Sequence, residues 1–180
     1  MAPPQRVVVV GNAGSGKTTL SSQLAARLGA EHIELDAIHH LADWTPIERE
    51  EMRRIVRERT NARRWVVVGG YGGMVGDIVF GRADTVVWLD SPRRVVMPRI
   101  VRRTLGRMLR GTKLWNGNRE RLRYLFDPRP ESNIILATWL DVRRLQALCP
   151  TMQADPVYTH LRWVRIASSA QLKVWLADLA

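Results

Sequence analysis

The chain alternates between short apolar runs and longer amphipathic stretches. Four apolar runs are continuous and rich in β-branched residues, and "HIELD", at His32–Asp36, is a shorter candidate strand. Continuous runs of this length are typical of strands that are buried on both faces of a parallel sheet. The four continuous runs are Arg6–Val10, Trp65–Gly70, Thr85–Asp90 and Leu161–Ala167.

The stretches between these runs have helical spacing. In Thr18–Gly29 leucines recur every four residues, and a glycine is placed to cap the carboxyl end. Thr45–Ala62 begins with Thr at the N-cap, Pro next and acids in its first turn. Strands that alternate with helices predict an α/β fold with helices on both faces of a parallel sheet. The other predicted helices are Ser91–Gly111, which Pro98 is expected to interrupt and kink, Asn133–Cys149 and Ser169–Leu179.

The least regular stretch is Thr112–Ser132, which is basic, rich in Asn, Gly and Pro, and holds three aromatic residues. Long irregular segments inside a compact domain are usually functional loops. We interpret it as a mobile insertion, a lid at about residues 109–132. The length of the chain suits one core, so a single domain is expected over residues 1–180.

The first apolar run leads directly into "GNAGSGKT", a full match to G-x-x-x-x-G-K-[ST] between a predicted strand and a predicted helix. The glycines allow backbone N–H groups to converge on phosphate oxygens, and the helix adds its positive amino end. We expect Lys17 to bridge the β- and γ-phosphates of ATP and the Thr18 hydroxyl to bind Mg²⁺. The predicted nucleotide-binding residues are Gly11, Asn12, Ala13, Gly14, Ser15, Gly16, Lys17, Thr18 and Thr19.

The charge of the chain narrows the range of partners. The formal net charge is +11 and comes almost entirely from arginine, since Lys17, Lys113 and Lys173 are the only lysines. Such a charge favours anionic partners, nucleotides or nucleic acid. The alternative is a general preference for arginine codons, which places solvated arginines on helix faces. No helix-turn-helix, zinc-finger or RNA-binding signature accompanies the charge.

The remaining composition predicts a cytoplasmic protein without a membrane partner. The apolar run near the amino end has about five residues, fewer than a secretory signal needs. No stretch approaches the ~18 apolar residues of a membrane-spanning helix. Cys149 is the only cysteine, and we interpret it as a buried free thiol in a reducing compartment.

Phosphoryl transfer also needs a carboxylate near the metal or the acceptor. Asp36 and Asp90 end predicted strands, where the ligand crevice of an open α/β sheet lies. Either could hold Mg²⁺ through water or orient an acceptor hydroxyl; alternatively, either caps the following helix. Asp36 is the stronger functional candidate. The adjacent His39 and His40 point in different directions, so no metal cluster is predicted.

Cations around the transferred phosphoryl group are the second requirement. Arg99, Arg103 and Arg107 share one helix face through i, i+4 spacing. They could close over nucleotide phosphates, or they could form a solvated face. Trp44 and Tyr71 could stack on a base, although core packing is more common for such residues.

Several stretches together resemble one group of small P-loop proteins, the adenylate-kinase-like or DNA-topology-modulation (FlaR-type) proteins. They are the P-loop, "ELDAIHH", "RWVVVGGY", "RADTVVWLDSPRRVVMPRIVRRTL" and "LWNGNRE". The resemblance runs from about Arg6 to the final helix. "RADTVVWLD" and "LWNGNRE" are its most specific parts.

This resemblance implies the three-layer sandwich of P-loop NTPases in the nucleoside/nucleotide-kinase superfamily. The five-stranded parallel sheet would have the order 2-3-1-4-5, with a small lid and an acceptor-binding segment at about Ile38–Ala62. The resemblance also implies that Arg99 stacks on the ATP base and that Arg103 grips phosphate.

The sequence departs from the family pattern after the third strand. The family usually reads "DGNY" there, and adenylate kinases read Asp-Gly-Phe-Pro-Arg, whereas this chain reads "VGGY". Val68 stands in place of the metal-organising aspartate and Gly70 in place of the asparagine, and no arginine follows the strand. We therefore expect weaker organisation of Mg²⁺, with Asp36 or Asp90 as the candidate substitutes.

The sequence favours a kinase that uses ATP and Mg²⁺ to phosphorylate a nucleotide or another small acceptor. Its expected catalytic residues are Lys17, Asp36, Arg99 and Arg103. The alternative is a weakly catalytic or non-catalytic nucleotide-binding regulator associated with nucleic acid, which the net charge and Val68 motivate. A motor ATPase is not favoured, because no water-positioning residue is evident. The acceptor and the oligomeric state are left open.

Overall fold

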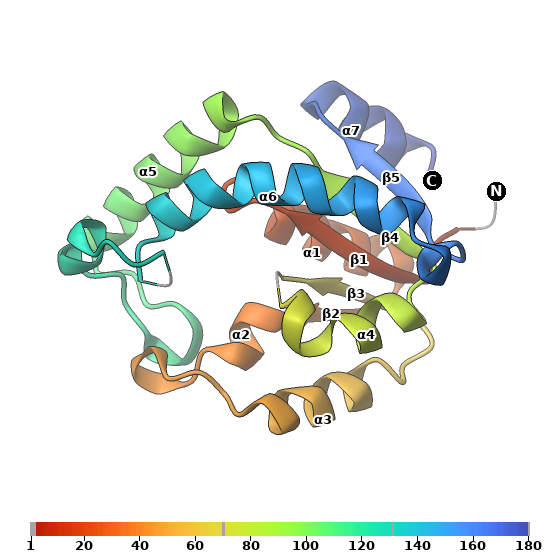
Figure 1. Ribbon diagram of the computed structural model, residues 1–180, viewed down its shortest axis with the longest axis horizontal. Helices are drawn as coiled ribbons and strands as arrows, with labels where there is room; N and C mark the ends of the chain where they lie inside the picture. Colours follow the sequence, from red (N-terminus) through yellow and green to blue (C-terminus); the bar gives the residue numbers. More distant parts are fainter. Residues whose placement is uncertain (1–2, 70, 131, 180) are drawn as a thin grey trace.

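The computed structural model describes residues 3–69, 71–130 and 132–179. Within these residues, five strands form one parallel sheet in the predicted order β2-β3-β1-β4-β5 (Figure 1). Gly70, which the sequence placed in the third strand, lies outside the described residues. The strands are β1 (Arg6–Gly11), β2 (Glu31–Glu34), β3 (Trp65–Val68), β4 (Thr85–Leu89) and β5 (Arg162–Ile166).

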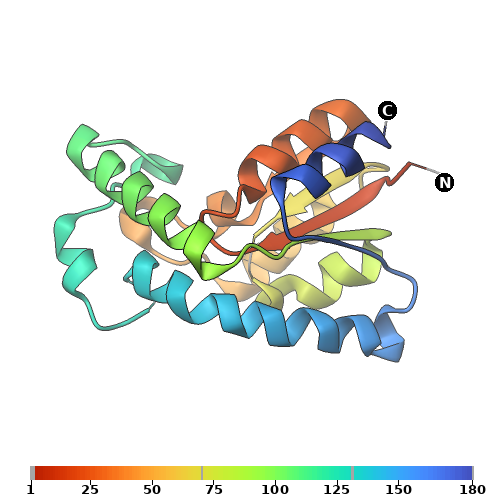
Figure 2. The ribbon, with the colours of Figure 1, turned by 90° about the horizontal axis from the view of Figure 1, so that it is seen from above.

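Helices cover both faces of the sheet, which confirms the predicted three-layer architecture (Figure 2). Along β1, Val7 and Val9 pack with helices on one face, whereas Val8 and Val10 pack with helices on the other. Because both faces of β1 are buried, its side chains form a continuous apolar run. The first face is covered by α1 (Lys17–Leu28) and α7 (Ser169–Ala177), and the second by α3 (Arg49–Arg59), α4 (Gly72–Arg82) and α6 (Ile134–Ala154).

The second strand ends earlier than the sequence predicts. β2 ends at Glu34, and the short helix α2 (Leu35–His39) follows directly. Leu35 is buried against Gly69 at the end of β3, where a Cβ on the glycine would lie 2.6 Å from the Leu35 Cβ. The prediction that Asp36 ends a strand is therefore wrong, because Asp36 lies in the first turn of α2.

The predicted helix at Thr45–Ala62 is shorter than expected. It begins only at Arg49, as α3, and Thr45 does not cap it. The Ile47 N–H donates instead to the His39 carbonyl at 2.8 Å, which holds the preceding residues in a loop. A 3₁₀ turn, η1 (Ala42–Trp44), lies within that loop.

The longest helices lie toward the carboxyl half. α5 (Arg93–Arg110) continues through Pro98, so the predicted interruption is not seen. α6 begins after Asn133 and extends to Ala154, beyond the expected end at Cys149. The described lid residues between α5 and α6 hold only two 3₁₀ turns, η2 (Trp115–Gly117) and η3 (Leu122–Phe126). Another 3₁₀ turn, η4 (Pro156–Tyr158), precedes β5.

Two further expectations concern burial. Cys149 is buried in the core as a free cysteine, as predicted, and burial raises the pKa of its thiol to about 12. In the described part of the chain, no helix combines the length and the apolar character that a bilayer span requires.

Candidate nucleotide and acceptor site

The P-loop lies between β1 and α1 and is open on one side. Gly14 and Gly16 have positive φ angles of 79° and 95°, which other residues rarely adopt. No atom of the described residues would lie within 4 Å of a Cβ on Gly16. On its other side the loop packs against α5, since a Cβ on Gly14 would lie 3.0 Å from the Val96 carbonyl oxygen.

Two buried polar atoms of the loop have no hydrogen-bond partner among the described residues. They are Oδ1 of Asn12 and Oγ of Ser15. Buried polar groups normally have partners, and the Ser15 hydroxyl could donate to a phosphate oxygen beside the open loop. The loop therefore fits a phosphate group.

Lys17, the first residue of α1, is partly buried beside this loop. Burial lowers the pKa of its ammonium group to about 8, whereas Asp36 raises that pKa and Arg103 lowers it further. The P-loop, α2 and α5 thus bring three of the predicted catalytic residues within electrostatic reach of one another. A bound phosphate would favour the charged form of Lys17.

Asp36 has a hydrogen-bond partner that the sequence did not reveal. Its carboxylate hydrogen-bonds the side chain of Tyr71, which comes shortly after β3. Burial, and then the charge of Asp36, raises the pKa of the Tyr71 hydroxyl, so the phenol stays protonated at neutral pH. Because β2 and β3 are neighbours, their carboxyl ends bring these two residues together.

Asp90 takes a different role from either reading of the sequence. Its side chain is buried and accepts hydrogen bonds from Arg165 Nε at 2.9 Å and Gln146 Nε2 at 3.0 Å. Pro92 is the N-cap of α5, and no side chain caps that helix. The Asp90 carboxylate therefore joins β4 to β5 and α6.

The predicted arginines line a basic hollow of about 450 Å³ on α5. Arg107 forms an ion pair with Glu120 of the lid at 3.1 Å. The Arg103 side chain is exposed, but loss of hydration beside neighbouring protein atoms, followed by the charge of Arg107, lowers the pKa of its guanidinium. The basic hollow is lined by Arg99, Arg102, Arg103, Gly106, Arg107, Arg110 and Thr112.

A larger hollow of about 780 Å³ lies between α3 and α4, and Arg53, one of its lining residues, is paired with Asp77. Arg53 donates two hydrogen bonds to the Asp77 carboxylate, at 2.8 and 2.7 Å, and one to the Met74 carbonyl at 2.6 Å. This ion pair lowers the pKa of Asp77 to about 2. We interpret the contact as a structural link between the two helices.

The expected metal position has few protein ligands. Val68 is 4% exposed and packs with Leu20 and Leu24 of α1, so apolar side chains surround the position where the resemblance implies an aspartate. The described residues contain no cluster of three His, Cys, Asp or Glu side chains that could hold a metal. Mg²⁺ would fit here as it often binds with nucleotides, through the exposed Thr18 side chain, phosphate oxygens and water.

The predicted lid contacts the predicted acceptor-binding segment directly (Figure 1). Asn118 donates from Nδ2 to the Leu41 carbonyl at 2.8 Å and accepts from the Trp44 N–H at 3.0 Å. The indole Nε1 of Trp44 donates to the Arg119 carbonyl at 3.2 Å. Trp44, a predicted base-stacking candidate, therefore has a structural role in joining the two segments.

A second set of contacts continues this junction toward α2. Trp115 Nε1 donates to Glu34 Oε2 at 3.0 Å, and Asn116 Nδ2 donates to the His40 carbonyl at 2.5 Å. We use the name clasp for the hydrogen bonds that join Trp115, Asn116 and Asn118 to Glu34, His40, Leu41 and Trp44. The clasp joins residues more than 70 positions apart in the sequence, so no local motif predicts it.

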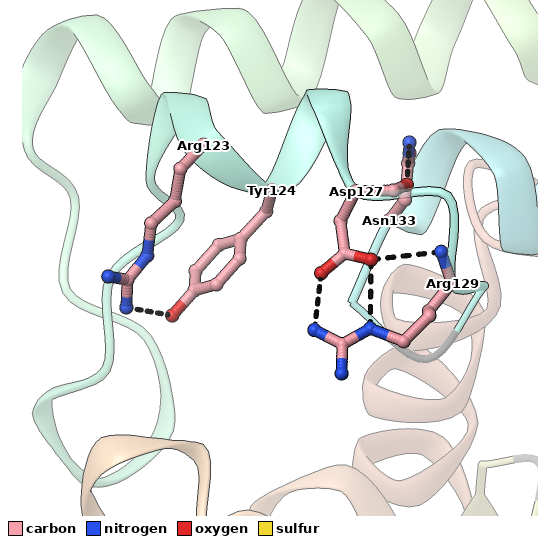
Figure 3. A network of polar contacts seen from close by, with 5 residues as sticks. All are labelled: Arg123, Tyr124, Asp127, Arg129 and Asn133. Carbon is pink, nitrogen blue, oxygen red and sulfur yellow. Dashed lines mark hydrogen bonds and ion pairs between the residues drawn. The ribbon is translucent and has the colours of Figure 1, made fainter.

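The far end of the lid is also held by hydrogen bonds (Figure 3). Arg129 contacts the Asp127 carboxylate through both its backbone N–H and its guanidinium, at 2.8–3.0 Å. Asn133 donates to the carbonyls of Leu125 and Asp127 and caps α6 with the same side chain. The segment that the sequence predicts to be a mobile lid is therefore held by hydrogen bonds at both of its ends.

The chain is similar to known proteins over most of its length. A family described as AAA domain matches residues 7–173. The chain belongs to the AAA domain family. This AAA domain protein is similar to the cytidylate kinases of Halobacterium salinarum, 32% identical over 114 residues, and Pyrococcus horikoshii, 31% identical over 113 residues. Each match covers 54% of this chain and 57% or 56% of the relative, so the chain spans about half the length of these relatives.

Solved structures show the same fold over nearly the whole chain. A shikimate kinase from Acinetobacter baumannii in complex with shikimate has a TM-score of 0.55 and 19% identity, covering 97% of this chain and 93% of that one. A gluconokinase from Sinorhizobium meliloti has a TM-score of 0.53 and 19% identity, covering 99% and 93%. The AAA domain protein therefore has the fold of P-loop kinases.

Proposed function

We propose that this protein is a small kinase that transfers the γ-phosphoryl group of ATP to a nucleotide or another small acceptor. The mutual electrostatic influence of Lys17, Asp36 and Arg103 carries this proposal. Asp36 lies in α2, just before the predicted acceptor-binding segment, and its charge acts on Lys17 beside the P-loop. An acceptor hydroxyl would approach the γ-phosphate near this carboxylate. The similarity to cytidylate kinases supports a phosphotransferase.

Each of the predicted catalytic residues has a role in this reaction. An acceptor that presents a hydroxyl would donate its proton to Asp36 as its oxygen bonds to the γ-phosphorus, while the bond to the β-phosphate oxygen breaks and ADP leaves. A nucleoside monophosphate would attack through an anionic phosphate oxygen, with no proton to transfer. Lys17 and Arg103 would neutralise the phosphate oxygens, and Arg99 would stack on the adenine base. Mg²⁺, held by Thr18 and the phosphates, would supply further charge neutralisation.

An ADP-release assay tests this proposal directly. We expect that the protein binds ATP and that one class of acceptor stimulates ADP release. The acceptors to compare are nucleoside monophosphates, sugars and shikimate-like alcohols. Bound ATP without stimulation by any acceptor would contradict the proposal.

The basic hollow on α5 favours a second candidate, a nucleotide-binding regulator that contacts nucleic acid. Four of its arginines, Arg99, Arg102, Arg103 and Arg110, are exposed on one helix. The resemblance to DNA-topology-modulation proteins supports the same idea. Contacts to phosphates would make the affinity for duplex DNA fall steeply with salt. Absence of binding at low salt would remove this candidate.

A further inference from the structure

The hydroxyl of Tyr71 contacts two polar side chains, Asp36 in α2 and His40 directly after α2. It is 3.1 Å from His40 Nε2, and it also hydrogen-bonds the Asp36 side chain. A phenol has one proton to donate, and a carboxylate can only accept. When Tyr71 donates its proton to Asp36, the tautomer that completes the chain is the one in which His40 Nε2–H donates to Tyr71.

Aromatic packing restrains the members of this chain. The ring of His39 lies 4.3 Å from that of Tyr71, centroid to centroid. The ring of His40 meets Trp44 edge-on at 5.1 Å and stacks on Trp115 at 5.9 Å. Side chains that are packed in this way can hold a hydrogen-bonding partner in one orientation.

The lid supplies part of this restraint. Trp115, which stacks on His40, belongs to η2, and the neighbouring Asn116 donates to the His40 carbonyl. Residues of the clasp therefore contact both the backbone and the ring of His40. Neither Tyr71 nor His40 has another role in the proposed reaction.

We propose that Tyr71 and His40 are positioning residues that hold the Asp36 carboxylate for the acceptor, and that the lid completes this arrangement through Trp115. The proposal rests on the proposed function, in which Asp36 receives the acceptor proton. Closure of the lid and orientation of the Asp36 carboxylate toward the acceptor would then occur in one step rather than two.

The order of the hydrogen bonds can be measured without an acceptor. Burial lowers the pKa of His40, so its ring is neutral near pH 7 and carries its single proton on Nε2 if it donates to Tyr71. We expect ¹⁵N NMR of labelled histidines to show this tautomer. We also expect Asp36→Asn to shift the His40 Nε2 signal, and this shift to vanish in the Tyr71→Phe background.

Kinetics test the consequence for catalysis. Tyr71→Phe should lower kcat about tenfold or more, the loss expected for one hydrogen bond to a charged group, with the Kd for ATP unchanged. His40→Gln keeps a side-chain N–H and should retain more activity than His40→Phe. The matched control is Tyr124→Phe on the lid, whose hydroxyl accepts a hydrogen bond from the exposed Arg123 (Figure 3).

The outcomes separate this inference from the proposed function. If no acceptor stimulates ADP release but the histidine signals respond as described, the kinase proposal fails while the hydrogen-bond chain stands. A His40 proton on Nδ1, or a His40 signal indifferent to Asp36→Asn, would overturn the chain. Full kcat in Tyr71→Phe alongside an inactive Asp36→Asn would overturn the positioning role.

Discussion

At the scale of single residues, two aspartates at the same edge of the sheet have different surroundings. Asp90 is 6% exposed, and Arg165 and Gln146 hold its carboxylate within the fold. Asp36 is partly exposed and lies near Lys17, with Tyr71 as its hydrogen-bond partner. We infer that Asp90 contributes to stability and that Asp36 contributes to function.

Substitution of each aspartate should separate these two contributions. Asp90→Asn weakens the hydrogen bonds that the buried Asp90 carboxylate accepts from the exposed Arg165 and from Gln146. We therefore expect a loss of about 1–3 kcal/mol in the free energy of unfolding with little change in ATP affinity. Asp36→Asn should leave that free energy nearly unchanged but lower turnover roughly 10²–10³-fold. Urea denaturation and ADP release measure the two effects. Equal stability losses in both variants would contradict the assignment.

Lys17 should make stability depend on pH in an unusual direction. Its folded pKa, about 8, lies below the ordinary value of 10.5, so its charge destabilises the apo fold below pH 8. This cost disappears as the pH rises from about 8 to 10.5. Lys17→Met removes the charge at every pH, so its stability advantage over the wild type should shrink across that window by about 3 kcal/mol.

Urea denaturation at several pH values between 7 and 10.5 measures this difference. Lys173→Met, at an exposed position on α7, is the matched control for losing a lysine elsewhere. A Lys17→Met advantage that does not change with pH would contradict the burial of the charge.

The sequence predicts residues that form one contiguous motif and misses those that meet only in space. The P-loop residues follow from a single stretch, because the strand, the glycines and the helix are local. The partners of Asp90 come from positions 56 and 75 residues away. Tyr71 likewise reaches Asp36 through the pairing of β2 with β3, which spacing alone does not reveal.

At the scale of elements, α4 shows where local propensity misleads. Four of its eleven residues are glycines, each of which costs a helix about 1 kcal/mol, and the sequence did not predict it. The helix forms because its apolar side chains are buried against the sheet, at about 1.5–3 kcal/mol each. Those side chains are Val75, Ile78, Val79 and Phe80.

The amino end of α6 offers a test of one element. Asn133 Oδ1 accepts from the N–H groups of Ile135 and Leu136, while Nδ2 donates to the Leu125 and Asp127 carbonyls of the lid. Asn133→Ala loses both functions, and we expect a loss of about 1–2 kcal/mol in the free energy of unfolding. Denaturation and hydrogen exchange of α6 measure this loss.

Asn133→Asp separates the cap from the lid contact. The aspartate keeps an acceptor for the helix N–H groups but has no donor for the lid carbonyls. We expect wild-type protection of the first turn of α6 and faster exchange in η3. If Asn133→Ala matches the wild type in both regions, the side chain does not anchor the lid.

At the scale of the whole molecule, the alternation of strands and helices and the resemblance together predict the order of the sheet. The sequence does not predict the contact between the lid and the acceptor-binding segment, because no periodic pattern marks the residues of the clasp. Asn118 is 5% exposed and bonds Leu41 and Trp44 across more than 70 positions. The clasp thus links two segments that the sequence describes only as separate functional parts.

Removal of the Asn118 side chain should free the lid without unfolding the sheet. Asn118→Ala loses two buried hydrogen bonds, and the opening of this junction should become about tenfold more frequent. Trypsin would then cleave faster after Arg119 and Arg121, while urea denaturation changes little. Asn61→Ala, which removes a contact with Arg82 instead, is the matched control and should leave lid cleavage at the wild-type rate. If the sheet stays folded, the clasp is the main restraint on Arg119 and Arg121. Equal cleavage in both variants would then mean that the clasp does not hold the lid.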